Sequence, residues 1–143
     1  MSYFKEREEM YSIYEALFDR VSTHPEVGPA LADSGLIVSF KLNNPEGEFT
    51  VNCREKPEEK GKYISAVFGA CGLKPDFAIS ASADFCHKFW LGKVDIVTSL
   101  FSGEARAEGD FSKAMKLLPV LKSVNKLYIQ MLEELGRKDL IVS

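Results

Sequence analysis

The sequence predicts a single α+β domain, in which helices at both ends of the chain enclose a central group of strands. Apolar residues recur at steps of three and four near both ends, and at steps of two over much of residues 36–81. The chain has 143 residues, of which 45% are hydrophobic and 27% charged, values typical of one globular domain. The sequence contains no internal repeat, low-complexity tract or linker, so residues 1–143 are treated as one domain.

Two helices are predicted before the first strand. Residues 3–23 carry an apolar stripe at helical spacing, with Lys5, Glu8 and Glu9 elsewhere on the helical wheel. A second, short helix is predicted to begin at Pro25, whose fixed φ suits a first helical turn, and to end near Gly35.

The next residues predict an antiparallel hairpin. Apolar and polar side chains alternate over residues 36–42 and again over 49–53, and a turn sequence rich in Asn, Pro and Gly separates the two runs. Residues 63–70 are apolar on both faces and are interpreted as a strand, although a buried helix fits the same pattern. A further alternating run covers residues 77–81.

Short helices are predicted to follow this strand. Ser82 or Asp84 is suited to cap a helix that ends at Gly92, because their side-chain oxygens accept bonds from free backbone N–H groups. The spacing of apolar residues over 94–101 predicts another short helix, which ends at Gly103.

The C-terminal part predicts one more strand and two helices. Residues 104–108 alternate between charged residues and alanines, and Gly109 closes this strand. Asp110 is expected to cap a helix over residues 111–118, which Pro119 should kink or break. A long helix with a continuous apolar stripe follows over residues 120–135.

Charge and cysteine content exclude several functional classes. The net charge is −3, and no basic face with interleaved aromatic residues occurs, so nucleic acid is not an expected partner. No apolar run approaches the roughly 18 residues of a membrane span, so stable membrane insertion is not expected either. Three cysteines without a CxxC pair indicate free thiols in a reducing compartment. With no signal-peptide pattern and no peroxisomal address at Leu140–Ser143, a cytoplasmic location is expected.

The sequence offers no convergent catalytic set. It lacks a phosphate-binding glycine loop, zinc-ligand spacing and a GxSxG nucleophile elbow. Cys86 and His87 are adjacent on a predicted helix and point about 100° apart, so they cannot form a Cys–His nucleophile pair with each other. His24, beside Pro25, is interpreted as a solvated polar residue. A non-catalytic protein without a cofactor or a metal is therefore expected.

Large apolar residues on the predicted helices flank strands that carry small residues. Ala105 and Ala107 are the only apolar residues of the last strand, so either a closely packed helix or a ligand must fill the space beside it. Plain core packing is the ordinary explanation for such a pattern. The ligand interpretation predicts a cavity lined by seven residues: Phe85, Phe89, Trp90, Val97, Phe101, Met115 and Leu118.

The order of these elements and three motifs resemble the sterol-carrier-protein family. The motifs are FWLGK at residues 89–93, SGEARAEGD at 102–110 and FSKAMKLLP at 111–119. The resemblance covers roughly residues 35–121. It implies a five-stranded, mainly antiparallel sheet covered by helices on one side, with an apolar tunnel between the layers. It also implies binding of fatty acyl chains, acyl-CoA thioesters or sterols, without a catalytic residue.

Three functional hypotheses follow. The first is a lipid-binding or lipid-transfer domain whose partner is an apolar small molecule, with Lys88, Lys93 or Lys113 either solvated or steadying an acidic head group. The second is an accessory subunit with the same fold and a filled core, forming a homodimer through residues 120–135. The third, the weakest, is an enzyme that uses Cys86 or Cys71.

Overall fold

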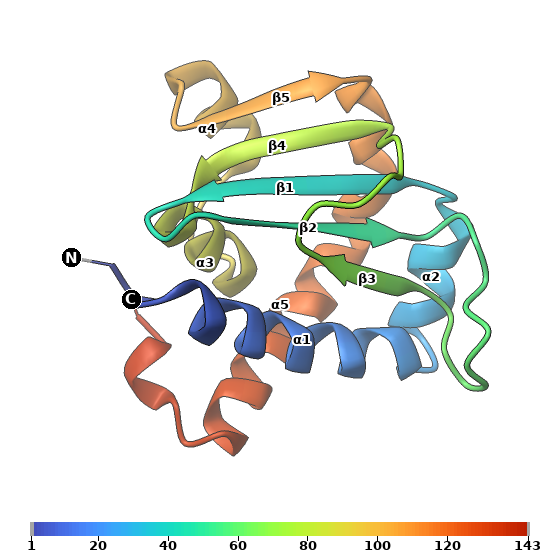
Figure 1. The fold of residues 1–143 in the computed structure, drawn as a ribbon, viewed down its shortest axis with the longest axis horizontal. Helices are drawn as coiled ribbons and strands as arrows, with labels where there is room; N and C mark the ends of the chain where they lie inside the picture. The colour runs from blue at the N-terminus through green and yellow to red at the C-terminus, as the bar shows by residue number, and fades with distance from the viewer. Residues whose placement is uncertain (1, 143) are drawn as a thin grey trace.

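The computed structural model describes residues 2–142 and consists of an open sheet of five strands with helices packed against one face (Figure 1). Strand β1 pairs in parallel with β4, and the other three pairings are antiparallel. The order across the sheet is β3-β2-β1-β4-β5. The strands are β1 (Ile37–Asn43), β2 (Gly47–Asn52), β3 (Ser65–Phe68), β4 (Phe77–Ser82) and β5 (Ala105–Gly109). The predicted α+β class and the mainly antiparallel sheet are confirmed.

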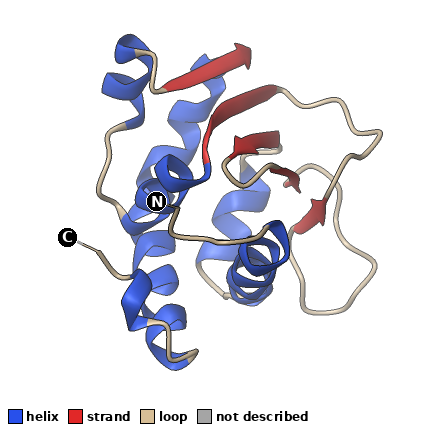
Figure 2. Cartoon of the chain, turned by 60° about the vertical axis from the view of Figure 1, so that its left-hand side comes forward, coloured by secondary structure: helices blue, strands red, loops and turns tan. Residues whose placement is uncertain are grey.

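The helices form the second layer, and Figure 2 shows them gathered to one side of the strands. They are α1 (Arg7–Thr23), α2 (Val27–Asp33), α3 (Ala83–Leu91), α4 (Ile96–Ser102) and α5 (Leu118–Glu134), with two 3-10 helices, η1 (Phe111–Leu117) and η2 (Lys138–Leu140). Helix α5 packs against α1 and α3. Within residues 2–142, no helix combines the length and apolar character needed to cross a membrane.

The alternation of the central strands places one apolar face against the helices. Phe40 of β1 pairs with Ile79 of β4 and with Phe49 of β2, and the two phenylalanine rings stack with centroids 4.8 Å apart. On the opposite face, the hydroxyl groups of Ser39 and Thr50 share a hydrogen bond of 2.9 Å. The connection between β3 and β4 crosses this second face (Figure 1). The core therefore lies between the sheet and the helices.

Two predicted boundaries in the first half of the chain shift for local reasons. Helix α2 begins at Val27 rather than Pro25, because His24 Nδ1 accepts the backbone N–H groups of Glu26 and Val27 at 3.1 Å each. His24 thus connects the end of α1 to the first turn of α2, a role that its position beside a proline did not predict. The strand predicted over residues 63–70 is shorter, because the Tyr63 N–H donates to the Ser22 carbonyl at 2.8 Å instead of joining the sheet.

The helix predicted over residues 111–118 forms as the 3-10 helix η1, and no residue in it is fully buried. The Asp110 carboxylate does not cap its backbone and instead accepts the Ser112 hydroxyl. The helix type changes to α at Leu118, and Pro119 occupies the first turn of α5, where a missing N–H needs no partner. The proline therefore marks a boundary between two helical segments that follow each other directly.

Candidate functional site

A cavity of about 80 Å³ lies between the sheet and the helical layer. Every side chain that lines it is apolar, and the lining comes from both layers. The sheet side and the adjoining residue 53 contribute Val38, Phe40, Val51, Cys53, Phe77 and Ile79. The helices contribute Phe18, Val21, Leu31, Phe89, Trp90, Ile96, Val97, Phe111, Ala114, Met115, Leu117, Leu118, Leu121 and Val124.

Capping contacts place the short helices around this cavity. The Ser82 hydroxyl accepts the Phe85 N–H at 3.0 Å and begins α3, whereas Gly92 ends it in a left-handed conformation. Asn125 of α5 donates its amide to the Trp90 carbonyl at 2.6 Å, which fixes the end of α3 against α5. The Asp95 carboxylate accepts the Val97 N–H at 2.9 Å and begins α4.

The structure brings five of the seven predicted site residues together around the cavity: Phe89, Trp90, Val97, Met115 and Leu118. Phe85 lines a smaller neighbouring cavity of about 10 Å³, together with Phe89 and Ile96. Phe101 does not line the cavity, because its side chain is 89% exposed on the outer side of α4. Contact of these residues with a ligand remains a prediction.

Sequence reasoning missed most of the lining. The alternation of β1 and β4 indicated that Val38, Phe40, Phe77 and Ile79 face the helices, but such residues normally contact other core side chains. The contributions of α1 and α2 had no sequence signal beyond ordinary amphipathic spacing. Where a gap remains between two apolar layers depends on how the helices cross the sheet, which one-dimensional spacing does not encode.

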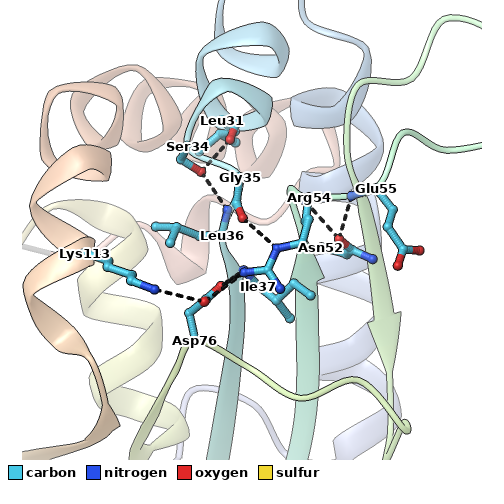
Figure 3. Close-up of polar contacts among 10 residues, drawn as sticks. All are labelled: Leu31, Ser34, Gly35, Leu36, Ile37, Asn52, Arg54, Glu55, Asp76 and Lys113. Carbon is cyan, nitrogen blue, oxygen red and sulfur yellow. Dashed lines mark hydrogen bonds and ion pairs between the residues drawn. The ribbon is translucent and has the colours of Figure 1, made fainter.

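A charged cluster attaches η1 to the sheet at one end of the cavity (Figure 3). The Asp76 carboxylate accepts the Ile37 N–H at 2.8 Å and pairs with the Arg54 guanidinium at 2.7 Å and 2.8 Å. The Lys113 ammonium of η1 approaches the same carboxylate at 3.4 Å. The hydrogen bond from Ile37, followed by the bonds from Arg54 and Lys113, lowers the pKa of Asp76. Lys113, one of three lysines considered for head-group contact, is therefore partnered in the protein.

The aromatic ring of Phe111 continues this attachment into the apolar layer. It packs edge-on against Phe77 with ring centroids 5.4 Å apart, and both rings line the cavity. The Asp110 N–H donates to the Asp76 carbonyl at 3.0 Å. The η1 segment thus covers one end of the cavity, with its first residues fixed to the start of β4.

The two buried thiols are held in their neutral form. Burial raises the pKa of Cys86 to about 12 and that of Cys53 to about 11. Reactive cysteines show the opposite shift, because the thiolate is the nucleophile. A thiol that stays protonated at neutral pH is a poor candidate for covalent catalysis.

His87 has a structural role that the sequence did not predict. Its side chain is fully buried, and Nε2 donates to the Leu140 carbonyl at 2.6 Å. Nδ1 then accepts the Tyr128 hydroxyl at 2.8 Å. The imidazole therefore joins α3, α5 and the C-terminal segment, away from the residues that line the cavity.

Acidification is expected to destabilise the protein through His87. Burial lowers its pKa, so below an unfolded value of about 6.5 the unfolded chain binds the proton more readily. The free energy of unfolding should fall between pH 6.5 and the lowered pKa, by at most about 1.4 kcal/mol per pH unit. Urea unfolding at several pH values checks this. His87→Gln should flatten the slope, whereas an equal slope in this variant and in the parent protein would exclude His87 as the source.

Comparison with known proteins identifies a matching family and several solved structures with a similar fold. The family model of the SCP-2 sterol transfer family matches residues 15–122. The sterol carrier protein domain 2 of Helicoverpa armigera is 22% identical with a TM-score of 0.57, over 83% of this chain and 87% of that chain. Sterol carrier protein 2 of Yarrowia lipolytica is 16% identical with a TM-score of 0.57, over 79% and 89%.

A third solved structure, palmitated SCP2L2 from Aedes aegypti, is 17% identical with a TM-score of 0.55, over 77% of this chain and 91% of that chain. No curated protein sequence matches the chain significantly. At these identities the solved structures establish a shared fold, whereas the family model covers most of the chain. The chain belongs to the SCP-2 sterol transfer family.

Proposed function

We propose that this protein binds one lipid non-catalytically, with the acyl chain or other apolar body of the lipid in the cavity between sheet and helices. Membership of the family supports lipid binding or transfer as the general function. The observation that carries the specific proposal is the lining of the cavity. All of the lining side chains are apolar, and they leave a space of about 80 Å³ between them. Such a space favours a molecule without polar groups along its length.

The energetics favour an apolar ligand without a charged clamp. Each buried methylene contributes about 0.8 kcal/mol, so about a dozen methylenes contribute roughly 10 kcal/mol before association costs. Loss of translational and rotational freedom costs about 4 kcal/mol or more. The balance of about 6 kcal/mol or less corresponds to a dissociation constant of roughly tens of micromolar or weaker, which suits a carrier that must also release its ligand.

The volume of the cavity indicates how such a ligand must enter. A volume of about 80 Å³ is roughly half that of an engineered cavity of about 150 Å³ that binds benzene. A long acyl chain therefore requires the cover to move outward. The second half of η1 is suited to this movement, because Met115 is exposed there, whereas Phe111 and Lys113 hold the first half against the sheet.

Two further observations support the proposal. The palmitated form of SCP2L2 from Aedes aegypti indicates that this fold can carry an acyl chain in another protein. In this chain, the raised pKa values of Cys53 and Cys86 favour a carrier over an enzyme with a cysteine nucleophile.

Trp90 supplies a direct test, because it is the only tryptophan and it lines the cavity. Its buried indole N–H has no hydrogen-bond partner among residues 2–142, so its emission should respond to a change in packing beside it. Titration with palmitate, or with its coenzyme A thioester, is expected to shift or quench the emission and to saturate at roughly tens to hundreds of micromolar ligand. Trp90→Phe should abolish the signal and weaken binding by only about 1 kcal/mol.

An independent binding measurement makes this test decisive. Native mass spectrometry of the protein purified from its host should show a retained lipid as added mass. A flat fluorescence titration with binding by mass spectrometry would place the ligand away from Trp90. Absence of lipid binding in both measurements would contradict the proposal and favour an accessory subunit with a filled core.

A further inference from the structure

Large apolar side chains are exposed where α4 and η1 border the cavity. The exposed fractions are 89% for Phe101, 58% for Met115 and 42% for Val97. Val97 and Met115 also line the cavity, so these two exposed residues mark its rim. Helices α4 and η1 lie at opposite ends of the edge strand β5 (Figure 1), and the rim therefore follows this edge of the molecule.

A basic stripe continues from this rim along α5. Residues 111–132 contain four lysines and no acidic residue, although the whole chain has a net charge of −3. Lys116, Lys122 and Lys126 are exposed and follow each other at steps of six and four, with exposed Pro119 between the first two. Lys122 and Lys126 therefore lie on one face of α5, and Lys116 follows Met115 directly in η1. Among residues 2–142, none of the three forms a salt bridge.

We propose that this surface docks reversibly on a lipid bilayer that contains anionic lipids. We call it the basic rim, and its residues are Val97, Phe101, Met115, Lys116, Lys122 and Lys126. The apolar side chains enter the outermost layer of the bilayer, and the lysines contact the anionic head groups. The inference rests on the proposed function, since it adds the surface at which the cavity exchanges its lipid with a membrane.

Charge favours a bilayer over a second copy of the chain. A symmetric dimer through this surface would bring two sets of unpaired lysines together, and like charges in contact are unfavourable. An anionic bilayer offers both components of the surface a partner, because the lysines are attracted to its anionic head groups and the apolar side chains leave water. Exposed Phe101, which contributes nothing to the lining of the cavity, acquires a role in this arrangement.

Vesicle co-sedimentation tests the docking surface. The full chain should bind vesicles of phosphatidylcholine and phosphatidylserine more tightly than vesicles of phosphatidylcholine alone, and added salt should reduce the difference. The triple variant Lys116→Gln, Lys122→Gln, Lys126→Gln should lower partition onto the anionic vesicles by on the order of 100-fold. Phe101→Ser should lower partition about tenfold, and its effect on folding should be small because the side chain is exposed.

A matched triple variant distinguishes the effect of charge at the basic rim from the effect of the net charge of the protein. Lys5→Gln, Lys56→Gln, Lys60→Gln removes the same charge from exposed positions elsewhere, and none of these lysines forms a salt bridge within residues 2–142. This variant should keep most of the binding. Equal losses in both triple variants, or no loss in either, would overturn the proposal. A dimer in sedimentation velocity that only the basic-rim variant abolishes would overturn it as well.

Failure of the docking proposal can be distinguished from failure of the proposed function. Trp90 titration with palmitate measures cavity binding without vesicles, and the basic-rim variants should retain it. Normal palmitate binding without vesicle binding would reject the docking surface and leave the proposed function intact. Selective vesicle binding by a protein that binds no lipid in its cavity would reject the proposed function and leave the docking surface intact.

Discussion

Ala114→Leu is expected to weaken fatty acid binding roughly 50-fold while increasing the stability of the protein. Ala114 lines the cavity, and leucine adds three carbon atoms that would occupy the space proposed for the ligand. Each displaced methylene loses about 0.8 kcal/mol of binding free energy. The same atoms fill a void of about 80 Å³, so the free energy of unfolding should rise by up to about 2 kcal/mol. Isothermal titration with palmitate and urea unfolding measure the two effects.

The opposite signs of the two effects make this variant informative. Ala16→Leu is a suitable control, because Ala16 is also a half-buried helical alanine packed on the core but lies outside the lining. It should leave palmitate binding unchanged. If Ala114→Leu raised stability without lowering affinity, the ligand would not occupy this cavity.

Gly109→Ala is expected to cause the largest loss of stability of any variant considered. Gly109 has a φ of 92°, and a Cβ at this position would lie 2.4 Å from the Asp76 carbonyl oxygen and 3.0 Å from Phe77 Cα. The left-handed backbone costs an alanine about 1 kcal/mol. The contact with a neighbouring backbone adds about 2 kcal/mol or more, because neither strand can move without breaking its pairing.

Gly103 provides the matched comparison. Its φ is 86°, but no atom lies within 4 Å of the position that a Cβ would take. Gly103→Ala should therefore lose only the backbone contribution of about 1 kcal/mol. Urea unfolding of the two variants gives the difference directly. Equal losses would show that the contact with Asp76 relaxes, and that the junction between β5 and η1 is less constrained than its geometry indicates.

The fold was predictable because local spacing and tertiary structure agree over most of the chain. Alternation identified the inward faces of β1 and β4, and glycines marked the ends of α3 and α4. One error arose where a long-range hydrogen bond replaces a local one, because Tyr63 bonds to the Ser22 carbonyl rather than to a strand. The other arose from a local side-chain contact, because His24 Nδ1 accepts the backbone N–H groups of Glu26 and Val27 at the start of α2.

The candidate site was only partly predictable. Trp90 and Met115 were identified because large residues flanked a strand of alanines, and both line the cavity. Phe101 satisfied the same pattern but lies four residues after Val97 near the exposed end of α4, where its ring points into solvent. The position of a helical residue relative to a cavity depends on how the helix is rotated, and a helix of seven residues carries too few apolar positions to determine that rotation.

Methyl-detected NMR of the complex with unlabelled palmitate tests the central claim most directly. If the acyl chain occupies the cavity, intermolecular NOEs should connect its methylene protons with the methyl groups of Val97, Met115 and Leu118. Leu135, which is exposed and outside the lining, should show none. Saturable palmitate binding without NOEs to the lining, or with NOEs to Leu135 instead, would contradict binding between the sheet and the helices.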